Sequence, residues 1–475
     1  MKKRVLLLLA IAVSALQAMA LSKTDFGSNN YIEAWGQLKL VTTSNSGNNK
    51  VQLADRCGNA VQLRGWATHG YQWASVRPFF NAKNDFEGMK KMGANVVRLT
   101  CYVSQDDVPY QSSWNNTKTW VKNAITWCHE LGIYAIVDYH VLTPGNPNTY
   151  LQKANNAKIW EKAEPFFTDI SAFVKQNGYH HVLYEICNEP NGGAANWDAI
   201  RDYANVILPI IAGNDPNAVV IVGTPNWSQY LTHASGNPLT HPTLQIMYTF
   251  HFYACTHSGL LNQGSHFTDA VLRSIPVFAT EWNNTNNYGQ GDCASTAYRT
   301  FLDRCNNDAT QRVSWTAWSW SPAEMEEKKP VTTPSVMVVR TSSTWKDGTP
   351  DDGTGYTANN LSPTGLMIYE ELQKNHINYY YYDSNCAVIT KPNVESTASI
   401  AFSIYPNPAK NGNFQITLPT HETAVLSIIN VQGQTVYSTT IKEKETTIKA
   451  DLETGIYLVT VKSENGKGAR KLVVE

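Results

Sequence analysis

Two short apolar segments of this chain each end in a glutamate, and this pattern constrains the fold more than any other feature. Residues 183–190 read LYEICNEP, an apolar strand that a proline ends directly after Glu189. Residues 276–282 read PVFATEW and carry Glu281 at the same relative place. Two carboxylates at the carboxyl ends of buried parallel strands are the minimum needed to cleave a glycosidic bond, and a parallel barrel carries its chemistry at that edge. We therefore predict Glu189 and Glu281 as a catalytic pair.

Short apolar runs alternate with helix-like segments from about residue 31 to about residue 386, which is typical of parallel βα units. Eight runs predict strands, near residues 61–66, 95–100, 133–139, 182–188, 218–223, 245–250, 276–282 and 313–318. Eight strands joined by helices predict an α/β fold, a (β/α)8 or TIM barrel. Residues 321–362 follow the eighth strand and are rich in Pro, Thr, Ser and Gly. They are either a lid on the active-site rim or a plain surface insertion.

Most of the predicted strands also carry polar or aromatic side chains at or near the same end. A single arginine in a strand usually forms a structural pair, and a single histidine usually makes one hydrogen bond. Seven of eight strands with such groups at one edge predict a shared cleft. The candidate substrate-binding residues are His69, Trp73, Arg98, Tyr102, His140, Asn188, His251, Tyr253 and Trp318.

The composition narrows the class of protein. A chain of 475 residues is too long for one ordinary domain and suits a barrel with a small module. Its net charge of -1 gives no electrostatic reason to expect a nucleic acid or an anionic membrane as partner. The 14 tryptophans and 24 tyrosines include candidates for holding sugar faces, although most of them are expected in the core. We expect no metal and no cofactor, and a monomer.

The chain has 8 cysteines, with no CxxC pair and no metal-ligand spacing. Cys101 and Cys187 lie in apolar strand patterns and are expected to be buried thiols. Cys293 and Cys305 flank a helix-like stretch and could pair with each other or with Cys255. The sequence leaves the connectivity open.

Both ends of the chain differ from the barrel pattern. Residues 1–20 combine Lys-Lys-Arg, an apolar run and a small-x-small site, which predicts a cleaved signal peptide and a mature protein that begins near residue 21, outside the cytoplasm. Residues 387–398 form a predicted linker. Residues 399–475 contain no Trp and no Cys and predict an all-β sandwich-like domain. Its expected strands lie near residues 413–418, 424–431, 433–440, 447–450, 455–461 and 469–474.

At these positions the chain resembles glycoside hydrolase family 5, a family of retaining (β/α)8 glycosidases. The resemblance covers about residues 36–386 and rests on the arginine of the second strand, Asn-Glu-Pro, His-x-Tyr, Thr-Glu-Trp and a late Trp, in the family's order. Residues 64–73 read RGWATHGYQW and resemble the bacterial endoglucanase branch. The resemblance implies hydrolysis of internal β-1,4-glucosidic bonds in cellulose-like glucans, with net retention of the anomeric configuration.

The resemblance also implies roles for the two carboxylates and their neighbours. Glu189 would be the acid/base and Glu281 the nucleophile. Arg98 would keep Glu281 ionised, Tyr253 would donate a hydrogen bond to it, and His251 would orient Glu189. Because the acid must hold a proton while its neighbour is ionised, repulsion between the two charges should raise the pKa of Glu189. Once the nucleophile is glycosylated, that pKa can fall and Glu189 can act as the base.

The remaining candidate residues would contact sugars. Asn188 would hold the 2-hydroxyl at the cleavage site, His140 would bind a neighbouring hydroxyl, and Trp318 would form a platform under the ring. Three further residues would shape the next glucose sites along the cleft, namely His69, Trp73 and Tyr102.

One segment departs from the endoglucanase pattern. Where that branch has a lysine soon after the eighth strand, this chain has Ala323, and the glutamate is displaced. An endo-β-1,4-mannanase or a mixed-linkage glucanase with the same chemistry therefore stays open as an alternative. A glycan-binding protein on an inactive barrel is a non-enzymatic alternative, although it would be expected to lack one carboxylate.

The tail resembles the C-terminal sorting domains of type IX secretion. The similar motifs, in order, are YPNP at 405–408, VQG at 431–433, LETGIY at 452–457 and KLVV at 471–474. The resemblance implies export by an outer-membrane secretion machinery, followed by removal of the tail, with release or surface attachment. A carbohydrate-binding β-sandwich is the alternative, and the lack of Trp argues against it. The expected partners are thus a β-glucan polysaccharide and the secretion machinery.

Overall fold

The structure is a computed structural model that divides into two compact units, Met1–Ile389 and Thr390–Glu475, which are described separately. The described residues are 29–45, 48–68, 83–102, 114–142, 145–151, 162–285, 296–307, 311–320, 363–374, 381–382, 385–389, 402–421, 423–430, 435–463 and 466–475. The predicted signal peptide, the segment 321–362 and most of the linker lie outside them.

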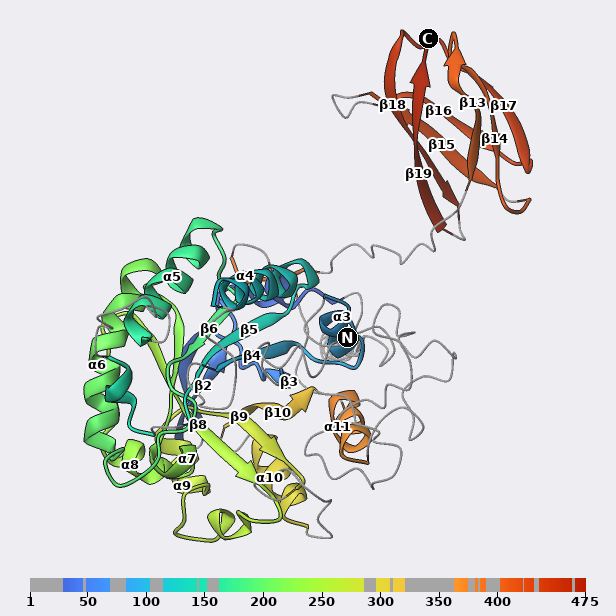
Figure 1. Cartoon of the computed structure of the whole chain (residues 1–475). Coiled ribbons are helices and arrows are strands. Elements are labelled where there is room, and N and C mark those ends of the chain that lie inside the picture. The colour runs from blue at the N-terminus through green and yellow to red at the C-terminus, as the bar shows by residue number, and fades with distance from the viewer. Residues whose placement is uncertain are drawn as a thin grey trace, which may run out of the picture. The chain divides into compact units, whose positions relative to one another are not determined.

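Eight parallel strands close into a barrel in the order β10-β3-β4-β5-β6-β7-β8-β9, which confirms the predicted fold class (Figure 1). The strands are β3 (Arg64–Thr68), β4 (Val96–Tyr102), β5 (Tyr134–His140), β6 (Val182–Glu185), β7 (Val219–Val222), β8 (Gln245–Tyr253), β9 (Val277–Asn283) and β10 (Ser314–Trp320). Each predicted strand overlaps an observed one. β6 ends three residues earlier than predicted, but the backbone N–H of Asn188 still donates to the carbonyl of Tyr139 on β5, at 3.2 Å. This bond helps hold the Asn-Glu-Pro turn at the strand tip.

Helices surround the strands (Figure 1). The α-helices are α2 (Tyr31–Trp35), α3 (Lys83–Lys91), α4 (Trp114–Leu131), α5 (Ala163–Gln176), α6 (Trp197–Asn214), α7 (Pro225–Ser228), α8 (Leu231–Gly236), α9 (Asp269–Ser274), α10 (Ala297–Cys305) and α11 (Pro363–Gln373). Two 3-10 turns are η5 (Pro147–Tyr150) and η7 (Ser258–Leu261). α6 begins where Asn196 accepts a hydrogen bond from the N–H of Ala199, at 3.0 Å. It buries Ile200, Ala204 and Ile211 along one face, as an amphipathic helix on a barrel must. Across the described residues, no helix is both long enough and apolar enough to cross a bilayer.

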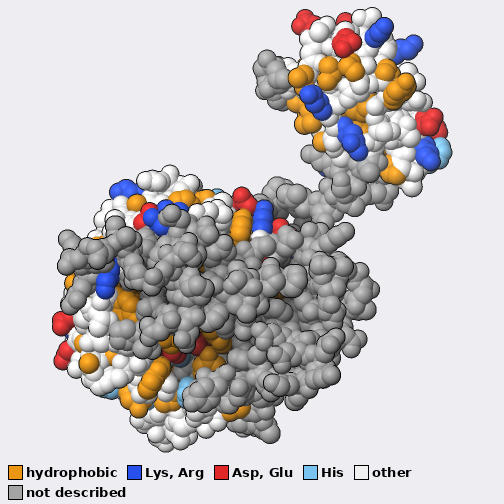
Figure 2. All heavy atoms as spheres, in the orientation of Figure 1, with side chains coloured by type: hydrophobic (Ala, Val, Ile, Leu, Met, Phe, Trp, Pro, Cys, Tyr) orange, Lys and Arg blue, Asp and Glu red, His pale blue; other side chains and the backbone are white. Residues whose placement is uncertain are grey.

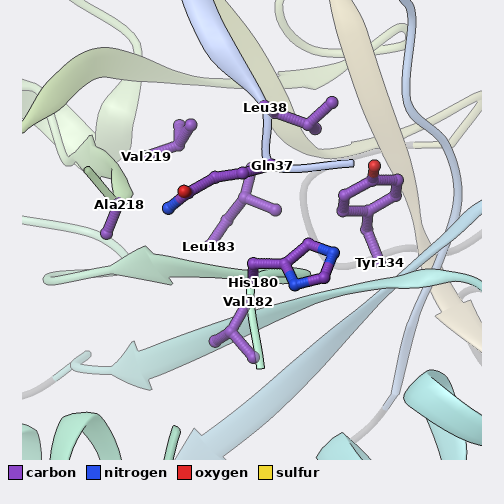
Figure 3. Close-up of a pocket in the computed structure, with 8 residues that line it drawn as sticks. All are labelled: Gln37, Leu38, Tyr134, His180, Val182, Leu183, Ala218 and Val219. Atoms are coloured by element: carbon purple, nitrogen blue, oxygen red, sulfur yellow. The ribbon is translucent and has the colours of Figure 1, made fainter. Parts of the chain in front are cut away.

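An antiparallel hairpin that the sequence analysis did not predict precedes the barrel. It consists of β1 (Lys39–Asn45) and β2 (Asn48–Ala54). The N–H of Leu40 donates to the side chain of Gln245, the first residue of β8, at 3.0 Å. The hairpin therefore lies at the amino ends of the barrel strands. A small cavity of about 10 Å³ at this end has room for about one water molecule. It is lined by Gln37, Leu38 and His180 with the starts of β5, β6 and β7 (Figure 3).

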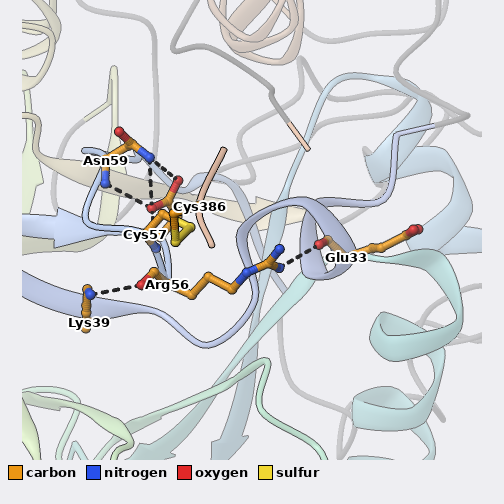
Figure 4. Close-up of a disulfide and its surroundings, with 7 residues drawn as sticks. Glu33, Lys39, Arg56, Cys57, Asn59 and Cys386 are labelled. Carbon is orange, nitrogen blue, oxygen red and sulfur yellow. Dashed lines mark hydrogen bonds between the residues drawn. A yellow bond between two sulfur atoms is a disulfide. The ribbon is translucent and has the colours of Figure 1, made fainter. Parts of the chain in front are cut away.

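A disulfide between Cys57 and Cys386 joins the loop after β2 to the two-stranded sheet of β11 (Tyr381–Tyr382) and β12 (Val388–Ile389) (Figure 4). Cys101 and Cys187 are buried free thiols, as predicted. The suggested pairing of Cys305 is wrong, because its thiol is free and buried between α10 and the barrel. Cys255 is disulfide-bonded to a residue outside the described part of the chain.

The second unit is a seven-stranded β domain with its own core, which includes Phe402, Phe414, Leu426 and Val459. Its strands are β13 (Ser403–Lys410), β14 (Asn413–Thr417), β15 (Ala424–Ile429), β16 (Thr435–Ile441), β17 (Glu445–Lys449), β18 (Gly455–Ser463) and β19 (Gly466–Val474). Six of them were predicted. β13 was missed because its two prolines cannot donate to a strand ladder. They lie where the pairing with β14 is interrupted, between Tyr405 and Lys410. Figure 2 shows hydrophobic side chains among charged ones on the visible face of this domain.

Candidate active site

The described candidate residues come together at the carboxyl ends of six barrel strands. They are Arg98 and Tyr102 on β4, His140 on β5, Asn188 and Glu189 after β6, His251 and Tyr253 on β8, Glu281 on β9 and Trp318 on β10. The register brings them level, since His251 pairs with Glu281 and Tyr102 pairs with His140. The two other candidates, His69 and Trp73, lie outside the described residues.

Glu281 is held by one donor on each carboxylate oxygen. Arg98 Nη1 donates to its Oε2 at 3.1 Å, and the hydroxyl of Tyr253 donates to its Oε1 at 2.5 Å. Burial, and then the charge of Glu281, raise the pKa of Tyr253 well above its usual range, so the phenol keeps its proton and stays a donor. These two donors hold an almost buried carboxylate in one orientation. The position of this carboxylate is therefore fixed at the carboxyl ends of the strands.

Glu189 has a different environment. Its side chain is 13% exposed, and its Oε1 lies 2.8 Å from Nδ1 of His251. Burial raises the pKa of Glu189 to about 8, and the charges of Asp138 and Glu185 add to this rise against the opposing effect of Arg98. Glu189 and Glu281 therefore differ in their partners, since Glu189 faces a histidine and Glu281 accepts from a guanidinium and a phenol.

The histidine beside Glu189 supports a proton on that carboxyl. Burial lowers the pKa of His251 to about 4, so the ring is neutral. Its Nε2 lies 3.2 Å from Oγ1 of Thr280, whose own proton goes to the Glu185 carboxylate at 2.8 Å. The hydrogen therefore lies on Nε2, and Nδ1 accepts. A protonated Glu189 satisfies that acceptor, whereas an ionised carboxylate would not.

Arg98 is fully buried and contacts two carboxylates in addition to that of Glu281. Its Nε and Nη2 donate to Glu185 at 2.6 and 3.2 Å, and Nη2 lies 3.0 Å from Asp138. Nη2 also donates to Oδ1 of Asn188 at 2.6 Å. Burial alone would lower the pKa of Arg98, but the charges of Asp138, Glu185 and Glu281 raise it above its usual value. The guanidinium therefore stays charged inside the barrel.

Asp138 and Glu185 were not predicted as site residues. The sequence signal that could have identified Asp138 is the alternation of side chains along a strand. Asp138 lies two residues before His140 on β5, so both side chains point to the same face. Glu185 lies four residues before Glu189. Both acids are completely buried, which requires partners such as Arg98.

The side chains that are expected to hold a sugar are packed against one another. His140 Nδ1 lies 2.6 Å from Asp138, and its Nε2 faces the amide of Asn188 at 3.4 Å. Burial and the nearby cation lower the pKa of His140 to about 3, so this ring is neutral as well. It stacks on Trp318 at 5.6 Å and contacts Tyr102 at 4.1 Å, between ring centroids. Together these side chains present polar groups beside an aromatic surface.

A second aromatic side chain near this edge was missed. Trp227 in α7 is 44% exposed and follows β7. It lies in a run of positive φ values, 59° at Asn226, 56° at Trp227 and 57° at Ser228, which is costly for residues other than glycine. The run is fixed on the Asn-Glu-Pro turn, because Trp227 N–H donates to the carbonyl of Pro190 at 2.9 Å. The sequence signal was an aromatic residue in the loop that follows a predicted strand, four residues after Gly223.

Glu189, His251 and Glu281 offer ligand atoms within 4.8 Å of one another, a spacing that a metal ion could use. Both oxygens of Glu281 already accept hydrogen bonds, one of them from the charged Arg98. A second cation there would be repelled by the guanidinium. The arrangement fits a pair of catalytic carboxylates better than a metal centre.

Comparisons with known proteins agree with this geometry. Residues 54–324 match the family model described as cellulase (glycosyl hydrolase family 5). An endoglucanase of Clostridium saccharobutylicum is 34% identical over 357 residues, which cover 74% of this chain and 69% of that protein. Endoglucanase A of Evansella cellulosilytica is 33% identical over 318 residues, which cover 67% of this chain and 57% of that protein.

A solved structure shows the same barrel. The catalytic domain of Thermobifida fusca endoglucanase Cel5A (E5) has a TM-score of 0.57 and 28% identity, and the match covers 73% of this chain and 100% of that chain. Residues 403–475 match the secretion system C-terminal sorting domain. The chain therefore belongs to glycoside hydrolase family 5 and carries a secretion sorting domain after its catalytic barrel.

Proposed function

We propose that this protein is an endo-β-1,4-glucanase that cleaves internal bonds of cellulose-like glucans by a retaining double displacement. The observation that carries the mechanism is the separation of the two carboxylates. One oxygen of Glu189 and one of Glu281 lie within 4.8 Å of each other. Retaining enzymes have carboxyl groups about 5–5.5 Å apart, whereas inverting enzymes leave room for a water between them, at about 6.5–9.5 Å.

The reaction begins with Glu189 protonated and Glu281 ionised. Glu281 attacks the anomeric carbon while Glu189 gives its proton to the leaving oxygen, so that a covalent glycosyl-enzyme forms and the glycosidic bond breaks. The charge of Glu281 is then lost, and the pKa of Glu189 can fall. Glu189 next takes a proton from an incoming water, whose oxygen displaces Glu281 from the sugar. The two inversions give net retention.

Substrate contacts follow from the residues around this pair. We assign Asn188 and His140 to hydroxyls of the sugar at the cleavage site and Trp318 to the face of that ring. Trp227 is assigned to a sugar of the leaving group, because its backbone is bonded to the turn that carries the acid. His69, Trp73 and Tyr102 remain assigned to the next glucose sites on the basis of the sequence resemblance.

The choice of cellulose-like glucan rests on the relatives, which are endoglucanases, and on the Cel5A domain, a variant of which has been solved with cellotetraose. The test is a panel of carboxymethylcellulose, mixed-linkage glucan and mannan incubated with the full chain. We expect release of reducing ends to be fastest from one of the two glucans. Faster release from mannan would replace the substrate and keep the chemistry.

Stereochemistry is tested separately. Proton NMR of fresh product from cellooligosaccharides should show the β-anomer first, with the α-anomer appearing later by mutarotation. An α-anomer that forms first would exclude retention. A double variant, Glu189→Gln with Glu281→Gln, provides the baseline without catalysis.

We further propose that the C-terminal domain directs export across an outer membrane and is then removed, leaving the enzyme released or attached to the cell surface. The match to a sorting domain supports this. Deletion of residues 399–475 should leave the protein inside the outer membrane of its host. Mass spectrometry of external protein should find no peptides from this tail. Full-length protein outside the cell would contradict removal.

A further inference from the structure

Glu185 is a buried carboxylate that the reaction as described does not use. Its side chain is completely buried, so no substrate can reach it. Four hydrogen bonds converge on it. Two come from Arg98 Nε and Nη2, at 2.6 and 3.2 Å, and the others come from the hydroxyls of Thr280 at 2.8 Å and Thr249 at 3.3 Å. Burial raises the pKa of Glu185, the charge of Arg98 opposes this rise, and the four donors favour the ionised form and fix its position.

These bonds determine which part of the guanidinium reaches the nucleophile. The Nε–Nη2 edge of Arg98 is occupied by Glu185, and Nη2 also contacts Asn188. Nη1 is left for Glu281, to which it makes a single bond at 3.1 Å. Without Glu185, Nε would lose its partner and only Asp138 and Asn188 would hold Nη2, so the guanidinium could turn its two-nitrogen edge towards Glu281 in the bidentate way that arginine prefers. That would place a second donor on the oxygen of Glu281 that already accepts from Tyr253.

The charge of Arg98 creates a second difficulty. A cation beside two carboxyl groups favours the ionised form of both. This suits Glu281 but would remove the proton from Glu189. The titratable groups around Glu189 lie on or directly after five strands. They are Arg98 on β4, Asp138 and His140 on β5, Glu185 at the end of β6 and Cys187 after it, His251 and Tyr253 on β8, and Glu281 on β9. The two histidines are neutral, so only carboxylates can offset the arginine.

We propose that Glu185 is a positioning residue of the reaction, which aims Arg98 at the nucleophile and supplies the buried negative charge that lets Glu189 keep its proton beside that cation. This inference rests on the proposed roles of Glu189 and Glu281. The charge of Glu185 acts in the required direction, because it raises the pKa of Glu189 while Arg98 lowers it. Asp138 adds charge of the same sign but also binds His140, so its removal would disturb a sugar contact.

The test is Glu185→Gln, which keeps the shape and removes the charge. The pH dependence of kcat/KM on a cellooligosaccharide should lose its basic limb about one pH unit lower than in the wild type, as expected for the loss of one nearby charge. The value of kcat should fall and KM should change little. With a dinitrophenyl cellobioside, whose leaving group needs no acid, the shift of the basic limb should disappear.

Asp215→Asn is the matched control. Asp215 is also a nearly buried carboxylate, but it lies at the amino end of the barrel beside Tyr184 and Gln37. The pH dependence of kcat/KM in Asp215→Asn should match that of the wild type. Glu185→Asp keeps the charge and should keep the basic limb in place at a reduced rate. If Glu185→Gln does not fold, Thr249→Val, which removes one donor to the same carboxylate, should shift the limb in the same direction by a smaller amount.

A basic limb at the wild-type pH in every folded variant that weakens or removes the Glu185 charge would overturn the proposal. Equal losses on both substrates with an unchanged pH profile would also overturn it, since they would indicate a purely structural role. Either result would leave the proposed function intact. Full activity of Glu281→Gln would instead refute the proposed function itself.

Discussion

Two buried arginines on adjacent strands of the barrel show how its two ends differ. Arg64 begins β3 at the amino end, and its guanidinium donates to main-chain carbonyls of Glu371 and Leu372, at 3.2 and 3.5 Å. Burial lowers its pKa to about 9. Arg98 on β4 donates instead to carboxylates, whose charges raise its pKa above the usual value. The same side chain therefore fastens α11 to the barrel at one end and organises charge at the other.

The surroundings repeat this contrast. At the amino end, several polar side chains donate to the main chain. Tyr134 donates to the carbonyl of Gly36 at 2.6 Å, and Arg56 donates to that of Glu33 at 3.1 Å (Figure 4). At the carboxyl end, charged side chains bond to one another. Variants at the amino end should therefore change stability, and variants at the carboxyl end should change the reaction.

The largest effect on turnover is expected for Glu281→Gln. The amide cannot form the glycosyl-enzyme, and loss of a nucleophile costs roughly 10⁴–10⁶-fold in kcat. The melting temperature should stay within a few degrees of the wild-type value, because the amide keeps the shape of the side chain and its oxygen still accepts from one of the two donors, Arg98 or Tyr253. The measurement is kcat on cellooligosaccharides, with calorimetry of the same sample. Residual turnover within tenfold of wild type would exclude Glu281 as nucleophile.

Glu189→Ala should have the next largest effect. Loss of general acid catalysis costs about 10²–10⁴-fold on natural substrates. Dinitrophenyl cellobioside should still form the glycosyl-enzyme, because its leaving group needs no proton. Azide should then accelerate turnover and give a β-glycosyl azide. If azide rescues Glu281→Ala instead and the product is inverted, the roles of the two glutamates are exchanged.

The arginine pair gives a direct test of the comparison. Arg98→Lys should lower kcat by about 10²–10³-fold, the usual cost of removing one preorganised electrostatic contact, because lysine cannot span Glu185 and Glu281 together. Arg64→Lys should leave kcat near the wild-type value and lower the melting temperature. Both variants are assayed for kcat and for thermal unfolding. Loss of activity in folded Arg64→Lys would show that the two ends are not separable.

The sequence predicted much of this arrangement and missed identifiable parts. The strand-end glutamates, Arg98, His251 and Tyr253 were found because apolar strands that end in polar residues are a local pattern. Glu185 was missed because a buried acid is defined by its partner on another strand. The hairpin of β1 and β2 was missed because it continues no βα unit. The pairing of Cys57 joins segments that are 329 residues apart, which no local pattern can indicate.

The pH dependence of the free energy of unfolding should also distinguish the carboxyl end of the barrel, which carries Glu189, from the amino end, which carries Asp215. The pKa values of Glu189 and Asp215 are raised by burial, to about 8 and about 6. The folded state therefore binds more protons, and each group's contribution to stability is lost as pH rises from its unfolded value through its folded value. Glu189→Gln should gain stability over the wild type as pH rises from about 4.5 to 8, and Asp215→Asn from about 4 to 6.

The corresponding pH profiles of activity should separate these two variants. In the wild type, kcat/KM should fall as pH rises through about 8, because Glu189 loses the proton it donates. Asp215→Asn should keep that limb. Thermal unfolding in a series of buffers supplies the stability curves. A change of the activity limb in Asp215→Asn would place its carboxylate in the electrostatics of the site.

The smallest effect on turnover is expected from loss of the Cys57–Cys386 disulfide, which lies with the covering segments of the amino end. It closes a loop of 329 residues, for which the chain-entropy model gives a contribution of up to about 6 kcal/mol to stability. The double variant Cys57→Ser with Cys386→Ser isolates this bond, because a reductant would also open the disulfide of Cys255. The melting temperature should fall by several degrees.

At a temperature where the variant is folded, kcat and KM should equal the wild-type values, since neither cysteine contacts the carboxyl ends of the strands. A changed KM in the folded variant would mean that the amino end controls the shape of the cleft, and the separation of the two ends would then fail.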